Sequence, residues 1–411
     1  MENLYIGRGK DADNAKLLAF LDEVFFADDE NGTKFLELLP KIYKDQYRPA
    51  YNNFVVQQPD GAFRAAVGNF DNDMTVGGMD LKTCCIGNVA VGRDCRGKGY
   101  MIDLMNASVK DMKQRGVVLS YLGGQRQRYG YFGYENAGVS YFFGFSKSSL
   151  RHALGGVKSG LTVEPLQPDD AEAIRLIDGI YAKAPVISRR APAAYFDILC
   201  SWHDAPYLIK EDGRFVGYAV FNKDMDYVGE FGLTDAALLP RLIAAALETG
   251  GRDSVCCAVA PYETEKLDFF TKNASWMNVN HCESVLVLDW KTVLTAYLNA
   301  KAAYETLCDG ELTVLIHGKA GDETLKLGVK DNAVSVTESD GAPRFELDCL
   351  RRCGRSFPTI PPTGRRSRPK SGNGCRCRCS SPQGIPCDET DGCSPSVSVL
   401  RVEIFDRCFV P

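Results

Sequence analysis

The segment from Cys85 to Leu122 constrains the fold more than any other part of the sequence. A short apolar run, Cys85 to Val91, is typical of a buried strand and ends at Gly92. Apolar residues then recur at helical spacing from Tyr100 to about Gly116, and Val117 to Leu122 indicates a second buried strand. Strand, glycine loop, helix and strand in this order predict an α/β unit with a ligand site at the loop.

The loop itself has the composition of a phosphate site. Gly97 and Gly99 allow a tight turn, and a helix that begins near Tyr100 directs unpaired N–H groups and its positive end into that turn. Arg96 and Lys98 add positive charge at the rim. A Walker A loop is excluded because its Gly-Lys-Ser/Thr ending is missing, and the dinucleotide fingerprint is incomplete because Ile102 replaces its third glycine. A plain glycine turn with solvated basic side chains is the alternative.

The rest of the chain divides into further blocks. At roughly 100 to 200 residues per domain, 411 residues suggest several packed units. A block from about Leu161 to Trp290 follows a similar order of helices and strands, and the next has one helix followed by strands of period two. We expect an α/β fold with mixed sheets and divide it into residues 1–155, 160–292, 293–350 and a tail, 351–411.

Several classes of protein are disfavoured by composition. No uncharged apolar run approaches the roughly 18 to 20 residues that span a bilayer, and the first residues lack a secretion signal. We therefore expect a soluble cytoplasmic protein with reduced, buried thiols and no membrane partner. No serine lies in a Gly-x-Ser-x-Gly elbow. No metal site is expected, because the histidines lack ligand spacing: His152, His203, His281 and His317.

Two motifs carry a family resemblance. Arg96-x-x-Gly99-x-Met101, after an apolar strand, resembles motif A of the GNAT acyltransferases, with Met101 in place of the usual Gly or Ala. Tyr129-Gly-Tyr-Phe-Gly-Tyr134 resembles the Tyr-x-x-x-Gly-Phe/Tyr motif of that family. The order of blocks over residues 1–350 resembles the Eis-type (enhanced intracellular survival) acetyltransferases, which consist of tandem GNAT domains and a sterol-carrier-like C-terminal domain.

The resemblance implies an enzyme that uses acetyl-CoA as co-substrate. The strand at Val89 would splay from its neighbour and bind the pantetheine arm, and Tyr129 would protonate the departing CoA thiolate. The alternative for Tyr129 is a packing aromatic, and Tyr134 is the better candidate for a core residue. The residues that would lie along the cofactor are Val89, Ala90, Val91, Arg96, Gly97, Lys98, Gly99, Tyr100, Met101, Ile102, Gly124 and Gln125.

The resemblance also implies a chemical class of acceptor and a single CoA site. The second block has Glu230-Phe-Gly-Leu-Thr-Asp-Ala236 where the loop would fall, so only the first block is expected to bind CoA. The acceptor would be a primary amine of a small cationic molecule or of a lysine-bearing peptide. The run Asp28 to Glu30 could attract it, or could be a solvated loop. A homo-oligomer remains open, and no nucleic-acid role is expected.

A different class of function competes with this one. The GNAT fold could be retained without catalysis, with the third block binding a lipid or acyl ligand in an apolar pocket and contributing nothing to acetyl transfer. The glycine loop together with Tyr129 favours the enzyme, because a lipid-binding protein needs neither. In the Eis-type enzymes the third block instead lends a wall to the active site.

Residues 351–411 differ from the rest of the chain. They hold 10 Arg, 1 Lys and 7 of the 16 Cys, whereas residues 1–350 hold 16 Arg and 21 Lys. We predict that this tail results from a shifted reading frame, and resequencing the gene around codon 350 tests the prediction. The competing hypothesis is a zinc site at Cys375, Cys377, Cys379, Cys387 and Cys393, which a confirmed single frame and a zinc-containing tail would support. Eis-type enzymes use their terminal carboxylate as general base, so no base is assigned here.

Overall fold

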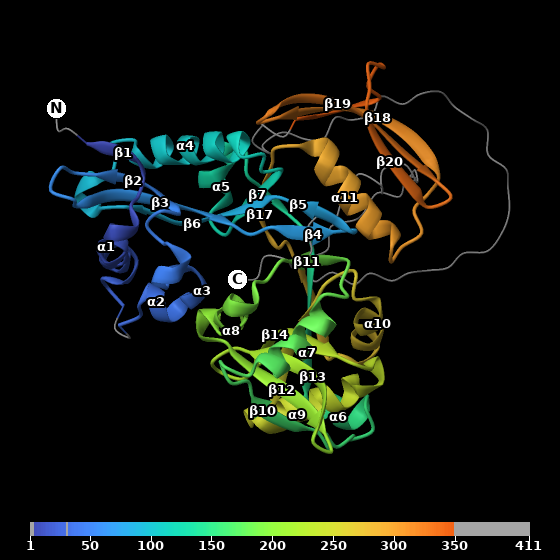
Figure 1. Ribbon diagram of the computed structural model, residues 1–411. Coiled ribbons are helices and arrows are strands. Elements are labelled where there is room, and N and C mark those ends of the chain that lie inside the picture. Colours follow the sequence, from blue (N-terminus) through green and yellow to red (C-terminus); the bar gives the residue numbers. More distant parts are fainter. Residues whose placement is uncertain (1–3, 30–31, 349–411) are drawn as a thin grey trace, which may run out of the picture. The chain divides into compact units, whose positions relative to one another are not determined.

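The computed structural model describes residues 4–29 and 32–348, and its first sheet contains the predicted strand-loop-helix-strand segment. β6 and β7 run parallel, and the other neighbours in this sheet are antiparallel (Figure 1). In spatial order the strands are β1 (Tyr5–Arg8), β2 (Asn53–Gln57), β3 (Phe63–Asp71), β6 (Thr83–Val91), β7 (Leu119–Leu122), β17 (Glu283–Val287) and β8 (Glu135–Ala137).

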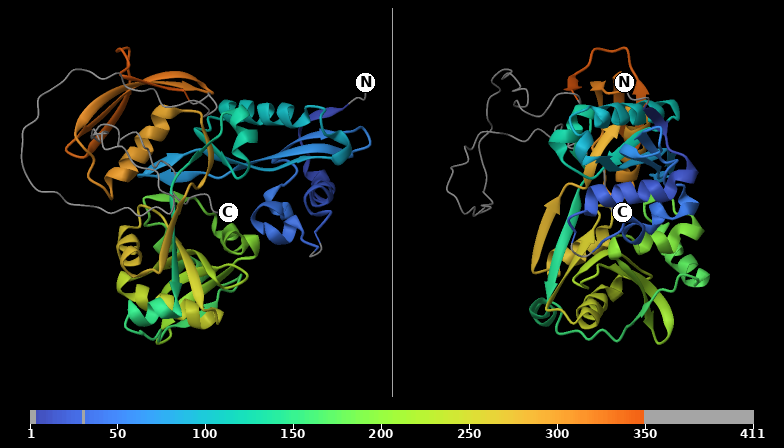
Figure 2. Two further views of the ribbon diagram at one scale, coloured as in Figure 1. Left: turned by 180° about the vertical axis from the view of Figure 1, so that it is seen from behind. Right: turned by 90° about the vertical axis from the view of Figure 1, so that its left-hand side faces the viewer.

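Helices cover both faces of this sheet because its strands are apolar on both sides. Successive strand residues point to opposite faces. Phe54 and Val56 of β2 therefore pack with α4 (Tyr100–Gln114), whereas Val55 between them packs with α1 (Asn14–Phe26). Figures 1 and 2 show these two helices on opposite sides of the strands. Two short helices follow α1, namely α2 (Phe35–Leu38) and α3 (Pro40–Tyr43).

The second sheet repeats much of this order, as the sequence predicted. Its strands are, in spatial order, β10 (Thr162–Pro165), β12 (Ala205–Glu211), β13 (Arg214–Phe221), β14 (Tyr227–Leu233), β15 (Ser254–Val259), β9 (Ser140–Ser146) and β16 (Trp276–Asn280). Again one pair, β14 with β15, is parallel. The helices of this region are α6 (Lys147–His152), α7 (Ala171–Tyr181), α8 (Tyr195–Leu199), α9 (Leu239–Gly250) and α10 (Thr264–Asn273).

Strand pairing departs from the expected division at residues 155 and 160 in three places. β9, from the first block, pairs with β15 and β16 of the second sheet, and β17, from the second block, lies between β7 and β8 of the first. Both strands are rich in buried apolar residues, and β17 covers the edge that β7 would otherwise expose. A three-stranded sheet also crosses the division, with order β11 (Val186–Ser188), β4 (Met74–Val76) and β5 (Met79–Leu81).

The third block has the predicted helix followed by period-two strands. α11 (Trp290–Ala302) begins after Asp289, whose side chain accepts the N–H of Thr292 at 2.8 Å. The strands of the four-stranded sheet are, in spatial order, β20 (Ala333–Glu338), β19 (Gly321–Lys330), β18 (Gly310–Gly318) and β21 (Phe345–Asp348). The tail at residues 351–411, with its predicted frameshift and the competing zinc ligands, lies outside the described residues.

The cysteines of the described chain range from buried to exposed. Cys84, Cys95 and Cys257 are buried, and burial raises the pKa of Cys84 and Cys95. Cys308 is exposed, which departs from the expected burial because it lies in the connection between α11 and β18. Within the described ranges no helix is long and apolar enough to cross a membrane.

Candidate active site

Strands β6 and β7 pair over three residues and then separate. Thr83, Cys84 and Cys85 face Leu119, Ser120 and Tyr121, whereas β6 continues to Val91 with β3 as its neighbour. Within the described chain no strand pairs with the β7 side of Ile86–Val91, so backbone groups of Val89, Ala90 and Val91 are available to a ligand there. The predicted splay at Val89 is therefore present.

A bulge shapes the strand at the point where it separates. Gly68 of β3 faces Gly87, but Ala66 faces Ala90, so β6 gains a residue between them. Asn88 lies in this bulge with φ of 36°, and its side chain accepts a hydrogen bond from Tyr43 and donates one to Asn53. The bulge turns β6 away from β7 and opens the gap.

The glycine loop ends at the N-terminus of α4. Gly97 and Gly99 have φ of 78° and 83°, the left-handed conformation that glycine adopts without strain. The carbonyl of Gly99 accepts the N–H groups of Ile102 and Asp103, but the N–H groups of Tyr100 and Met101 have no acceptor in the described chain. Arg96 and Lys98 are exposed beside them and form no ion pair with a described acid. Ile102 is 56% exposed.

The chain after β7 brings Gly124, Gln125 and Tyr129 together. Gln125 precedes α5 (Arg126–Tyr129), and the Tyr129 ring returns to cover Gly124, where an added Cβ would lie 2.6 Å from it. Tyr129 is 7% exposed. Burial raises its pKa, although the neighbouring Arg128 lowers it, so the phenol stays protonated at neutral pH. A protonated phenol is the form that a general acid requires.

Tyr134 has a different environment although it belongs to the same motif. Its ring is 1% exposed in the core beneath α4, and its hydroxyl lies 2.7 Å from the Ser120 hydroxyl. A tyrosine that is enclosed and hydrogen-bonded in this way supports the fold. Both tyrosines belong to the same apolar core, but only Tyr129 also contacts Gly124 after β7.

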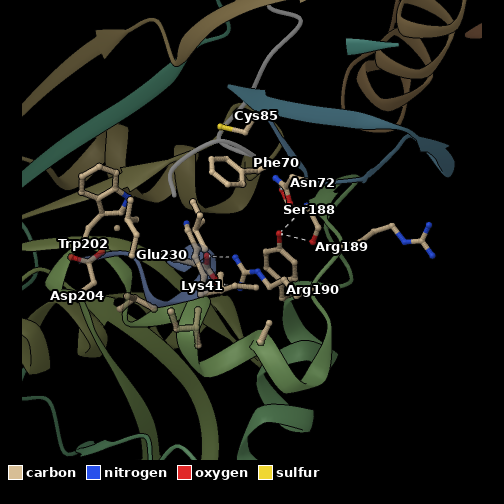
Figure 3. A pocket seen from close by; sticks show the side chains of 18 of the residues that line it. Lys41, Phe70, Asn72, Cys85, Ser188, Arg189, Arg190, Trp202, Asp204 and Glu230 are labelled. Carbon is tan, nitrogen blue, oxygen red and sulfur yellow. Dashed lines mark hydrogen bonds and ion pairs between the residues drawn. The ribbon is translucent and has the colours of Figure 1, made fainter. Parts of the chain in front are cut away.

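A cavity of about 1240 Å³ opens where the two strands separate. Cys85 to Asn88 from β6, with Tyr121 from β7 and Gly123 just after it, contribute to its wall. Aromatic rings from α1 to α3 and residues of the second block complete it. Figure 3 shows Lys41 of α3 together with Arg190, Trp202 and Glu230 of the second block. No residue of the third block, within the described part, lines this cavity, so the expected wall is not provided by residues 293–348. That block instead packs α11 against β4, where Gly77 closely approaches Ala296.

Residues 6–137 match the family described as the acetyltransferase (GNAT) domain. Residues 6–137 form a GNAT acetyltransferase domain. The chain is accordingly an enzyme of the N-acetyltransferase type, and the GNAT fold uses acetyl-CoA as acyl donor. No curated protein matches the sequence.

Solved structures show the same fold over most of the chain. A GCN5-related N-acetyltransferase from Kribbella flavida is 19% identical with a TM-score of 0.60, and the match covers 84% of this chain and 86% of that one. Another GCN5-related N-acetyltransferase, from Anabaena variabilis, is 15% identical with a TM-score of 0.60 and coverage of 85% and 88%. Eis1 from Mycobacterium abscessus is 13% identical with a TM-score of 0.58 and coverage of 85% and 87%.

The charges around the cavity beside the GNAT domain are balanced. Its lining includes five acids and five bases: Asp71, Asp204, Glu230, Glu263 and Glu283, with Lys41, Lys183, Arg189, Arg190 and Lys266. Asp28, from the acidic run expected to attract the acceptor, is not among them and pairs instead with Arg93 at 2.6 Å. Glu30 lies outside the described residues.

Two buried cations of this lining were not among the residues singled out from the sequence. Both guanidinium nitrogens of Arg190 bind Glu230, at 2.8 and 2.6 Å, while the guanidinium lies 3.7 Å from the centre of the Tyr181 ring. Burial lowers the pKa of Lys41 to about 8. Figure 3 shows both residues beside Glu230. Neither belongs to a motif, and only the packing of the second block against the GNAT domain brings them together.

The second block lacks the features that the GNAT domain has at its loop. After β14 the chain turns at Asp235, whose carboxylate accepts the N–H of Ala237 at 2.8 Å. In the second block an acidic side chain therefore occupies the helix N-terminus, whereas the corresponding position in the first block has free N–H groups. A second pyrophosphate would meet a negative charge there.

Proposed function

We propose that this chain transfers the acetyl group of acetyl-CoA to a primary amine of a small cationic molecule or a lysine-bearing peptide, as an Eis-type acetyltransferase. The observation that carries the proposal is the gap between β6 and β7, which has the glycine loop at one end and the cavity at the other. The pantetheine arm would lie along Val89 to Val91, the pyrophosphate at the N-terminus of α4, and the acceptor in the cavity.

Tyr129 is the proposed general acid. As the amine attacks the thioester carbonyl, the C–N bond forms and the C–S bond then breaks, and the CoA thiolate takes the phenolic proton. A phenol with a reference pKa of about 10 can protonate a thiolate whose conjugate acid has a pKa of about 8.5 at little cost, and the raised pKa of Tyr129 keeps its proton in place until then.

A thiol-release assay with acetyl-CoA against a panel of amines tests the function. Polyamines, aminoglycosides and lysine peptides are the informative members of the panel. Release of one thiol per acetylated amine is expected for at least one class. Release no faster than spontaneous hydrolysis across the whole panel would contradict the proposal.

Gly99→Val is expected to weaken acetyl-CoA binding tenfold or more, equivalent to about 1.4 kcal/mol. Space is not the reason, since an added Cβ meets no atom within 4 Å. Valine avoids the left-handed conformation at φ of 83°, so the loop must shift and the free N–H groups must move from the pyrophosphate. Calorimetry with acetyl-CoA measures the change.

Gly116→Val is the matched control for this variant. Gly116 follows the other end of α4 with φ of 73° and equally open surroundings, so the substitution imposes the same strain away from the loop. Its affinity for acetyl-CoA should stay within about twofold of wild type, because a strained turn at this end leaves the N–H groups in place. Equal affinity in both variants, or two CoA molecules per chain, would contradict a single site at this loop.

A further inference from the structure

Strand β17 brings a carboxyl group to the point where β6 and β7 separate. Glu283 is its first residue and lies next to the end of β7, where a Cβ added to Gly123 would be 3.2 Å from a Glu283 carboxylate oxygen. The next residue, Gly124, is the one that Tyr129 covers. Consecutive Cα atoms are about 3.8 Å apart, so Glu283 and Tyr129 approach the same strand end at neighbouring positions.

Three of the other four acids of the cavity form ion pairs, and the fourth, Asp204, lies away from the strand end. Asp71 pairs with Arg115 at 2.5 Å, Glu230 with Arg190 at 2.6 Å, and Glu263 with Lys266. Asp204 lies beside Trp202, on the wall opposite Cys85 (Figure 3). Glu283, in contrast, has no hydrogen bond or ion pair with another described side chain. It lies close enough to Cys85 for its negative charge to raise the pKa of that thiol. It is the carboxyl of the lining that is both unpaired and located at the strand end.

We propose that Glu283 is the general base that removes the proton from the attacking amine. The proposal rests on the proposed function and adds the group that the sequence left unassigned. The amine nitrogen bonds to the thioester carbonyl carbon, its proton passes to the Glu283 carboxylate, and the C–S electrons leave with sulfur. Tyr129 protonates that sulfur, and exchange with water returns a proton to Tyr129 and removes one from Glu283, which balances the cycle.

The surroundings of Glu283 suit this role. The nearest titratable group is the Cys85 thiol from β6, on which the charge of Lys41 from α3 also acts. Two further groups, Tyr121 of β7 and Glu135 of β8, lie opposite Val285, two residues along β17, and Arg126 binds Glu135 through both carboxylate oxygens. Burial raises the pKa of Glu283 to about 7, and burial raises that of Cys85 to about 12. Cys85 is therefore neutral at physiological pH, while Glu283 exchanges its proton there, as an effective base does.

Glu283→Gln tests the proposal in the full chain. The amide keeps the shape of the side chain but cannot accept the proton, so turnover in the thiol-release assay should fall roughly a hundredfold or more. Acetyl-CoA affinity by calorimetry should stay within about twofold, because the carboxyl does not belong to the glycine loop. The wild-type rate should fall as pH drops through about 7, and this limb should be absent in the variant.

Glu164→Gln is the matched control, because Glu164 of β10 pairs with Lys210 and does not line the cavity. It should keep turnover within about threefold and keep the limb near pH 7. Glu283→Ala is the second variant, and added formate is expected to restore its activity. This variant keeps the proposal testable where Glu283→Gln does not fold. Wild-type turnover in Glu283→Gln, or an alanine variant that binds acetyl-CoA but gains nothing from formate, would overturn the proposal while the proposed function stands. A wild-type chain that acetylates no amine would overturn both.

Discussion

Tyr129→Phe is expected to lower turnover roughly ten- to a thousandfold while leaving acetyl-CoA affinity nearly unchanged. The substitution removes a single hydroxyl, so the ring continues to cover Gly124 and the loop at α4 is untouched. What is lost is the proton donor for the departing thiolate, which contributes in the transition state and not in the bound ground state. Steady-state kinetics and calorimetry on the same preparation separate the two quantities.

Tyr134→Phe is the control for this experiment. Its hydroxyl contacts Ser120 in the core and does not reach the gap, so the cost should appear in stability and turnover should change little. Full activity in Tyr129→Phe would assign protonation of the thiolate to another group or to water. A large loss of turnover in Tyr134→Phe with unchanged stability would contradict the division of roles within the motif.

Arg190→Met is expected to lower the free energy of unfolding by about 3 kcal/mol. The Arg190 side chain is 9% exposed and neutralises Glu230, whose carboxylate also accepts the Tyr218 hydroxyl at 2.9 Å. Without the guanidinium the Glu230 carboxylate, whose side chain is 30% exposed, loses the cation that binds both of its oxygens, and breaking a largely buried pair costs more than the pair contributes in the native protein. Urea unfolding followed by fluorescence measures the difference.

The effect of pH distinguishes this explanation from a loss of packing. In the variant, the pKa of Glu230 should rise in the folded state, so the folded state binds more protons and gains stability as pH falls. The loss of unfolding free energy in Arg190→Met, relative to wild type, should therefore be smaller at pH 5 than at pH 8. Arg175→Met, on the exposed pair with Glu172, should change stability little at either pH. A deficit that does not depend on pH would point to the lost contact with the Tyr181 ring.

Periodicity predicted the local structure well because local structure depends on neighbouring residues. The strand predicted to end at Val91 ends there, and the helix predicted from Tyr100 ends at Gln114, two residues before Gly116. Sheet membership was not predictable in the same way. β9 and β17 each carry a buried apolar pattern that suits either sheet, and what decides their pairing is which strand edge lies beside them in the folded chain.

The same distinction applies to the candidate site: residues of sequence motifs were predicted, and residues brought in by long-range packing were not. Gly97 and Gly99 belong to one short motif and Tyr129 to another, and the spacing within each motif can be recognised from the sequence. Glu283 has no motif, and it reaches the gap through a strand whose pairing spans more than 150 residues of sequence. Lys41 and Arg190 likewise act through a cavity that exists only once the second block packs against the first. These residues can be recognised only from their burial in the folded structure.

The exchange of β9 and β17 has a consequence for how the protein is made. A nascent chain that has reached residue 155 contains the glycine loop and Tyr129, but the outer edge of β7 still lacks its partner. That edge can close only after the ribosome has added Val287, and such distant pairing is slow to form. Tyr129, the proposed general acid, is thus synthesised well before the strand that carries Glu283. We therefore expect a fragment that ends between the two blocks to be inactive, because it lacks both Glu283 and the strand that pairs with β7.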